Sequence, residues 1–159
     1  HSFPTRRSSD LDSLDPARSI SGPMAPWFSQ QVEYRMVTGP SLLRGLPGDQ
    51  GGERLWMRTR DGAPLDEARL CYLMDAVYPP GWTVVTQPFR AATVDLRYDI
   101  LMDPTPENAP DGWAFFEFSL IDLGGGWTLD DLTVRDGAGN ILAIGRQRRK
   151  LAPTRPPRP

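Results

Sequence analysis

The sequence predicts an α+β fold in which one helix packs against an antiparallel β-sheet. Only one stretch of the chain, residues 64–80, combines helix start and stop signals with apolar residues over several turns. The other apolar segments alternate with polar residues, and glycine- or proline-rich turns separate them, which is typical of antiparallel strands. One helix against one such sheet makes a two-layer domain.

The predicted helix begins at Pro64, which two acidic residues follow closely, and it ends at a pair of prolines. Apolar residues cover most of its circumference, which predicts that it is buried. They are Leu65, Ala68, Leu70, Cys71, Leu73, Met74 and Val77. Asp75 lies in the last turns, where the helix dipole disfavours negative charge and burial of an unpaired carboxylate is costly. Asp75 is therefore the first candidate for chemistry.

Six segments carry the strand pattern, two before the helix and four after it. They are residues 32–37, 53–60, 91–102, 113–123, 127–135 and 141–151. Strict alternation in the third segment places Thr93 on the face opposite Val94 and Leu96. Because Trp56 and several other aromatic residues cannot all lie beneath one helix, we expect a second copy of the fold to cover the other face of the sheet.

Four regions are expected along the chain. Residues 1–11 match, residue for residue, one reading frame of a widely used sequencing-adaptor DNA, so we interpret them as non-native and expect the true start to be missing. Residues 12–30 are rich in Ser, Pro and Asp and predict a disordered linker. Residues 31–151 form the predicted domain, and the Pro- and Arg-rich residues 152–159 predict a disordered tail.

Composition excludes several classes of function. The 159 residues carry a formal net charge of −2, so we expect no nucleic-acid partner and no attraction to a membrane surface. Cys71 is the only cysteine, which excludes an internal disulfide, and we expect it in the core. The only histidine is His1, so nucleophile–histidine schemes and histidine-bound metals have no support. A general base must be Asp, Glu, Lys, Tyr or a water that they hold.

Several features occur in a set order over residues 32–151. They are Trp56-Met-Arg58, the late-helix Asp75, Ala92-Thr-Val-Asp95, Asp136-Gly-Ala-Gly-Asn140 and Ala143-Ile-Gly-Arg-Gln147. In this order they resemble the C-terminal hotdog domain of the acyl-CoA thioesterase II family. The resemblance implies a hotdog fold, a long central helix wrapped by an antiparallel sheet. It also implies a partner sheet joined side by side, from a missing N-terminal half or from a homodimer.

The family's site combines a helix carboxylate, a Thr or Ser on the next long strand and a Gln on the last strand. Asp75, Thr93 and Gln147 match these positions. The resemblance implies that they hold a water that hydrolyses acyl-CoA to fatty acid and CoA in cytoplasmic fatty acid metabolism, without metal or cofactor. Taken singly, each residue also fits an ordinary surface position on a helix end or a strand.

Arg146, Arg148 and Arg149 make the last strand more basic than in better-known family members. They are candidates for binding the CoA phosphates, and the alternative is a solvated strand that resists aggregation. Two other functions stay open: a non-catalytic acyl-thioester-binding or assembly domain, and a hotdog hydratase. The second is disfavoured because the predicted domain has no histidine.

Overall fold

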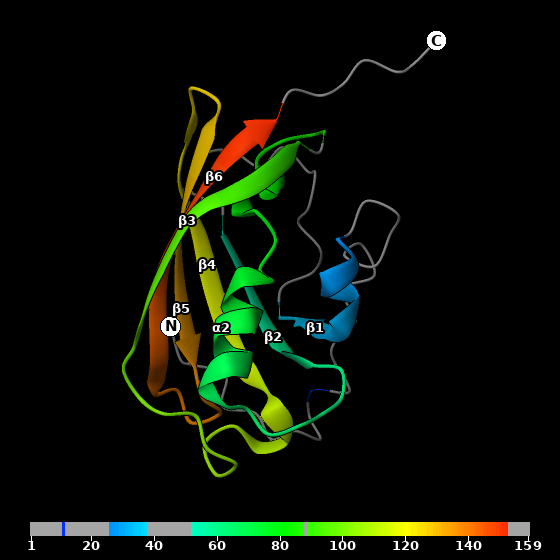
Figure 1. The fold of residues 1–159 in the computed structure, drawn as a ribbon, viewed down its shortest axis with the longest axis vertical. Coiled ribbons are helices and arrows are strands. Elements are labelled where there is room, and N and C mark those ends of the chain that lie inside the picture. The colour runs from blue at the N-terminus through cyan, green and yellow to red at the C-terminus, as the bar shows by residue number, and fades with distance from the viewer. Residues whose placement is uncertain (1–10, 12–25, 38–51, 88, 153–159) are drawn as a thin grey trace.

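The structure is a computed structural model that describes residues 11, 26–37, 52–87 and 89–152. Its six strands form one antiparallel sheet in the order β1-β2-β4-β5-β6-β3. The strands are β1 (Val32–Met36), β2 (Gly52–Thr59), β3 (Arg90–Ile100), β4 (Ala114–Gly124), β5 (Trp127–Arg135) and β6 (Ile141–Ala152). The helix α2 (Glu67–Asp75) lies against one side of this sheet (Figure 1). The predicted α+β arrangement is therefore confirmed, with small differences at the strand ends.

Short 3-10 helices occupy three connections: η2 (Trp27–Gln31), η4 (Pro80–Thr83) and η5 (Pro110–Gly112). The predicted linker up to residue 25, the tail from residue 153 and most of the predicted non-native segment lie outside the described residues. Within the part of the chain that is described, no helix has the length and apolar character needed to cross a membrane.

The helix is shorter than the sequence predicted, because it spans nine residues and not 64–80. Asp66 caps its N-terminus, where its side chain accepts a hydrogen bond from the backbone N–H of Arg69 at 2.7 Å. The helix ends at Asp75, and Ala76 is its C-cap. The proline pair that follows disfavours helical backbone at the residue before it. The prediction that the helix is buried nearly all round is wrong: only Leu70, Leu73 and Met74 are buried, and Asp75 is exposed.

The main core lies between α2 and the inner face of the sheet. Leu55 and Met57 of β2 are fully buried there against the apolar face of the helix. Tyr34 of β1 donates a hydrogen bond to the backbone oxygen of Ala76 at 3.0 Å, and burial raises the pKa of this tyrosine. The hydroxyl therefore stays protonated and ties the end of the helix to the edge strand.

A second cluster lies on the outer face of the sheet. Trp56 and Phe115 pack with ring centroids 5.3 Å apart, and Leu11 and Trp113 complete the buried group. The guanidinium of Arg58 lies 4.7 Å from the centre of the Trp113 ring. The chain itself thus covers Trp56, so the expectation that a second copy of the fold must do so is wrong. Leu11 belongs to the segment that the sequence indicated as non-native.

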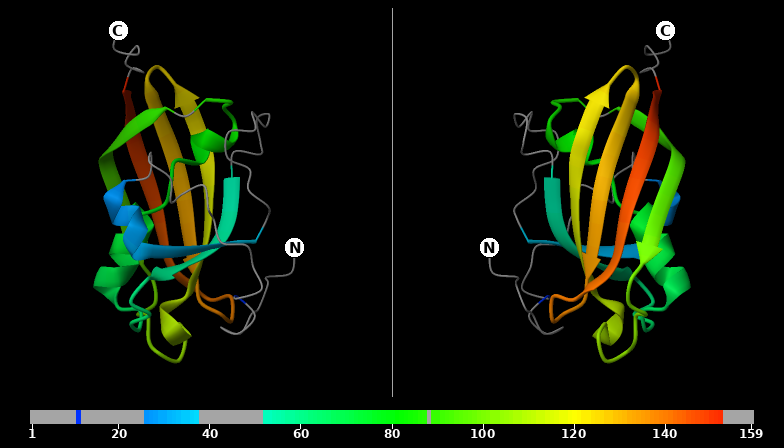
Figure 2. Two further views of the ribbon diagram at one scale, coloured as in Figure 1. Left: turned by 90° about the vertical axis from the view of Figure 1, so that its right-hand side faces the viewer. Right: turned by 90° about the vertical axis from the view of Figure 1, so that its left-hand side faces the viewer.

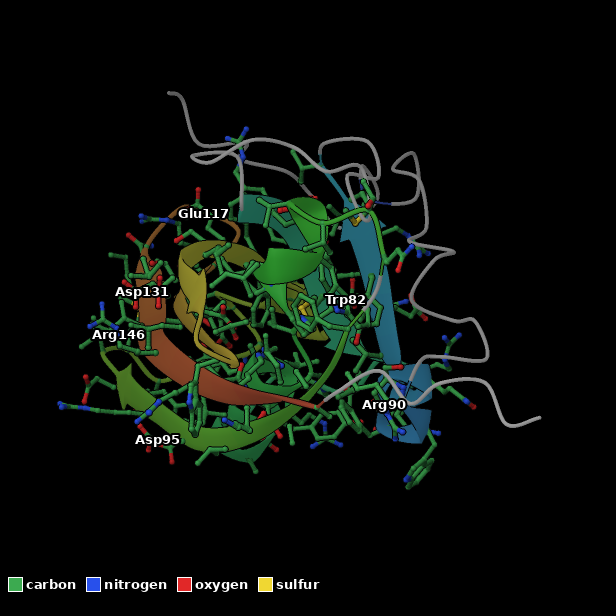
Figure 3. The ribbon with its side chains drawn as sticks, turned by 90° about the horizontal axis from the view of Figure 1, so that it is seen from above. Trp82, Arg90, Asp95, Glu117, Asp131 and Arg146 are labelled. Atoms are coloured by element: carbon green, nitrogen blue, oxygen red, sulfur yellow. The ribbon has the colours of Figure 1, made fainter. Side chains whose placement is uncertain are left out.

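Ion pairs lie elsewhere on the outer face. Arg135 lies 3.1 Å from Glu117, and Arg146 lies 2.6 Å from Asp131. Glu117, Asp131 and Arg146 lie along the outer side of the curved sheet, with α2 inside the curve (Figure 3). Figure 2 shows the same sheet from its two sides, with β3 at the end of the strand order next to β6.

We predict that Asp61, in the turn before α2, titrates far below the ordinary Asp value of about 3.9. Hydrogen bonds from the Thr59 hydroxyl, the Ala63 N–H and the Arg69 guanidinium lower its pKa to about 2. Because the folded pKa is depressed, ionised Asp61 stabilises the fold above the unfolded-state pKa, and this contribution is lost as pH falls to about 2. A carboxyl-carbon NMR titration measures the midpoint.

Arg69→Met should raise that midpoint, because one of the three donors is lost. Arg97→Met is the matched control, since Arg97 pairs with Asp99 on β3 and is exposed. A wild-type midpoint near the ordinary value would show that the turn does not hold the carboxylate as described.

Candidate active site

Three polar side chains from three different elements meet beside the end of the helix. The Nε2 amide of Gln147, on β6, donates to Oδ1 of Asp75 at 3.1 Å and to Oγ1 of Thr93, on β3, at 2.7 Å. Gln147 is 5% exposed, whereas Asp75 and Thr93 are exposed. The structure therefore brings together the three residues that the sequence indicated, within direct hydrogen-bonding distance. Their chemical role stays a prediction.

Thr93 reaches the site through a β-bulge. The register of β3 against β6 shifts between Thr93 and Asp95, so Thr93 lies opposite Arg149 and Leu96 lies opposite Gln147. One extra residue thus puts Thr93 and Leu96 on the same inner face and leaves Val94 60% exposed. The strict alternation expected from the sequence, with Thr93 on the face opposite Leu96, is wrong here because a bulge breaks the period of two.

Gly145 allows the end of the helix to lie close to β6. A Cβ atom at this position would lie 2.9 Å from the Cε atom of Met74 and 3.3 Å from the backbone oxygen of Arg97. Met74 directly precedes Asp75, and Gly145 lies two residues before Gln147. The missing side chain therefore helps to set the distance between Asp75 and Gln147.

The three arginines of β6 do not form one cluster. Arg146 pairs with Asp131 on the outer face, and the guanidinium of Arg148 lies 4.1 Å from the centre of the Trp127 ring. Arg149 is on the inner face with Gln147 and is 6% exposed. The sequence predicted one role for all three arginines. Alternation along the strand, however, places Arg149 on the same face as Gln147.

Burial dominates the electrostatics of Arg149. It lowers the pKa of the guanidinium, and the carboxylates of Asp130 and Asp75 offset part of this effect. Burial likewise raises the pKa of Asp130, and Arg149 offsets part of that. Removing two such charges from water is costly, and buried ion pairs of this kind contribute little to stability compared with apolar residues.

Tyr98 and Cys71 lie near Asp75. Burial raises the pKa of Tyr98, with smaller contributions from Cys71 and from the charge of Asp75. Sequence reasoning did not single out Tyr98 as a neighbour of the site, because its alternation marked it only as a core residue. Cys71 is partly exposed, so its predicted place in the core is wrong.

The cavity that adjoins the site is small. Its volume is about 10 Å³, and Val77, Asp130, Gln147 and Arg149 are among the residues that line it. A space of this size holds roughly one water molecule. It is too small for any larger ligand.

The model of a protein family described as "Acyl-CoA thioesterase C-terminal domain" matches residues 9–148. No curated protein matches the chain.

Solved structures share the fold. A protein of unknown function with a hotdog fold from Alicyclobacillus acidocaldarius aligns with a TM-score of 0.74 and 20% identity, over 97% of this chain and 56% of that one. An acyl-CoA thioesterase II from Mycobacterium marinum aligns with a TM-score of 0.60 and 21% identity, over 96% of this chain and 57% of that one. A hypothetical thioesterase with coenzyme A from Streptococcus pneumoniae TIGR4 aligns with a TM-score of 0.55 and 11% identity, over 77% of this chain and 88% of that one.

At these identities the structural alignments show the fold alone. They confirm the predicted hotdog architecture. The chain spans about half the length of the first two structures, 56% and 57%.

We predict that Gly145→Val separates Asp75 from Gln147. The added side chain meets Met74 and backbone, and overpacking of this kind costs about 1–3 kcal/mol of stability. Thermal unfolding measures that cost, and a structure of the variant should show the bond between Gln147 and Asp75 lengthened or lost. Gly124→Val is the control, because a Cβ at Gly124 meets nothing within 4 Å. An unchanged site in a stable Gly145→Val variant would contradict the role given to this glycine.

Proposed function

We propose that this chain, which belongs to the acyl-CoA thioesterase C-terminal domain family, hydrolyses acyl-CoA to a fatty acid and coenzyme A. One observation supports the proposal most directly: a single buried amide, that of Gln147, bonds both Asp75 and Thr93. A carboxylate, a hydroxyl and an amide held together in this way can orient a water molecule without a histidine. We place the reaction in cytoplasmic fatty acid metabolism.

Each of the three residues has a distinct part in the proposed reaction. Gln147 holds Oδ1 of Asp75, which leaves Oδ2 to accept a proton from water. The Thr93 oxygen accepts from Gln147, so its own hydrogen can be donated to the water oxygen. The water is then held between Thr93 and Asp75 with its lone pair free for attack.

The proposed hydrolysis has no covalent enzyme intermediate. The water oxygen attacks the thioester carbonyl carbon while Asp75 takes one proton. The tetrahedral intermediate collapses, the C–S bond breaks, and the proton leaves with the CoA sulfur. Thioester and water thus become carboxylic acid and thiol, and the carboxylate is restored.

The proposed enzyme needs a second hotdog sheet. Among the strands of the described residues, β3 is an edge strand that pairs only with β6, and most of its residues are exposed. Exposed edges of this length are usually covered or paired. We therefore propose that the partner is an N-terminal hotdog half of a longer chain or the same strand of a second copy. This neighbour would supply the wall for the acyl chain that the small cavity at Gln147 cannot provide.

We predict that Asp75→Asn lowers kcat for acyl-CoA hydrolysis by about 10² to 10⁴, because a positioned general base contributes that much. The folded structure should be unaffected, since Asp75 is an exposed residue. Thiol release from a panel of acyl-CoA esters measures the rate. Asp99→Asn is the matched control, because Asp99 is an exposed carboxylate of β3 that pairs with Arg97.

Unchanged turnover in Asp75→Asn would exclude Asp75 as the base. Tight binding of acyl-CoA with no thiol release from the wild-type protein would instead support the alternative of a non-catalytic acyl-thioester-binding domain.

A separate proposal concerns the CoA phosphates, for which we expect the exposed Arg146 and Arg148 to supply positive charge. Arg149 is left out of this proposal, because it is buried and its guanidinium is bonded to Asp130. The KM for CoA esters should then rise with salt more steeply than the KM for a short pantetheine thioester, which has no phosphate. Equal salt dependence of the two substrates would argue for a solvated strand alone.

A further inference from the structure

The hydrolytic mechanism leaves one buried cation of the site without a part in the reaction. Arg149 donates to Oδ2 of Asp130 at 2.9 Å, to the backbone oxygen of Val77 at 2.9 Å and to Oε1 of Gln147. Its side chain is 8% exposed and that of Asp130 is 5% exposed. Three parts of the fold thus meet at this guanidinium: β5, the segment after α2, and β6 itself.

The hydrogen-bonding capacity of the groups fixes the orientation of the Gln147 amide. A guanidinium only donates, so the atom of Gln147 that faces Arg149 must be the oxygen. The amide is planar, so its NH₂ group then points away, toward Asp75 and Thr93. A flipped amide would place its oxygen against the Asp75 carboxylate and its NH₂ against Arg149. Both contacts would be unfavourable.

Asp130 fixes the position of Arg149 in turn. Asp130 lies opposite Gln147 in the pairing of β5 with β6, so it is next to the amide along the sheet. Its carboxylate occupies the Nε edge of Arg149 and turns the Nη2 atom toward Gln147 and Val77. A buried ion pair contributes little to stability compared with apolar residues of similar volume. The geometry instead gives this pair a directional task.

We propose that Arg149, held by Asp130, is a positioning residue that keeps the amide of Gln147 in the orientation required to bond Asp75 and Thr93. This inference deepens the proposed hydrolysis and rests on it for its kinetic consequence. The orientation of the amide can be measured independently of any substrate.

The first experiment observes the Gln147 side-chain amide directly in the full chain by ¹⁵N NMR. In the wild type its NH₂ protons should be protected from exchange with water, because both are hydrogen-bonded. In Arg149→Met the protection should fall, and Arg149→Lys, which keeps a buried donor, should retain part of it. Arg135→Met is the matched control, because it removes an arginine of β5 that pairs with Glu117 on the outer face. Unchanged protection in Arg149→Met would overturn the inference.

Arg149→Met leaves Asp130 buried without its partner, which can unfold the domain. The double variant Asp130→Leu/Arg149→Met removes both charges together and tests the same orientation in a core that tolerates the change. Loss of protection in a folded double variant supports the inference, and retained protection overturns it.

The second experiment separates positioning from general structural damage. Arg149→Met should lower kcat between about tenfold and a hundredfold with little change in KM, as misplacement of a catalytic group does. In a Gln147→Ala background the same substitution should cost nothing further, because Arg149 acts through Gln147. Losses that multiply in the double variant would overturn the inference, since they would show an effect that bypasses the amide.

Failure of the proposed function gives a different result. If the wild type releases no thiol from any acyl-CoA, or if Gln147→Ala is fully active, the hydrolytic proposal fails. The NMR experiment still tests whether Arg149 orients the amide in that case. If hydrolysis depends on Gln147 but Arg149→Met leaves both protection and kcat unchanged, only the positioning inference fails.

Discussion

The site depends on the use of every hydrogen-bonding group of one buried amide. The oxygen of Gln147 faces a cation, and its two N–H groups face a carboxylate and a hydroxyl. An amide in the core that lacked any of these partners would carry an unsatisfied polar group, which costs about 1–3 kcal/mol. The same bonds that satisfy Gln147 therefore also fix Asp75 and Thr93, although both of these side chains are exposed.

Much of the fold could be predicted from the sequence, because its segments alternate clearly and its breaks are strong. The single helix and the six strands follow from such local patterns, as does the Asp136–Asn140 turn, where the Asp136 carboxylate accepts from the N–H of Ala138 and of Asn140. The end of the helix could not be predicted as well. Apolar residues continue beyond Asp75, and only the folded chain shows that they pack without helical backbone.

The set of site residues could be predicted only through a family resemblance, and its geometry could not be predicted at all. The bulge at Thr93 depends on how β3 pairs with β6, and nothing in the alternation of β3 marks it. Arg149 lies only two residues from Gln147, yet its partner Asp130 comes from another strand. The positions of these residues thus depend on how the strands pair. That pairing cannot be read from the pattern of any single segment.

The site has a buried part and an exposed part. The orienting residues Gln147 and Arg149 are buried, whereas Asp75 and Thr93 are exposed at the edge of the sheet formed by β3. In the proposed hydrolysis, a general base open to bulk water would exchange its bound water freely, and charge stabilisation in the transition state is weak at high dielectric. The proposal therefore requires a further wall that excludes water from Asp75. A second sheet paired at β3 would lie next to Thr93 and could cover Asp75 without disturbing the bonds that hold either residue. The exposed edge strand and the exposed carboxylate of Asp75 are thus linked in the proposal, because covering the edge would also enclose the carboxylate.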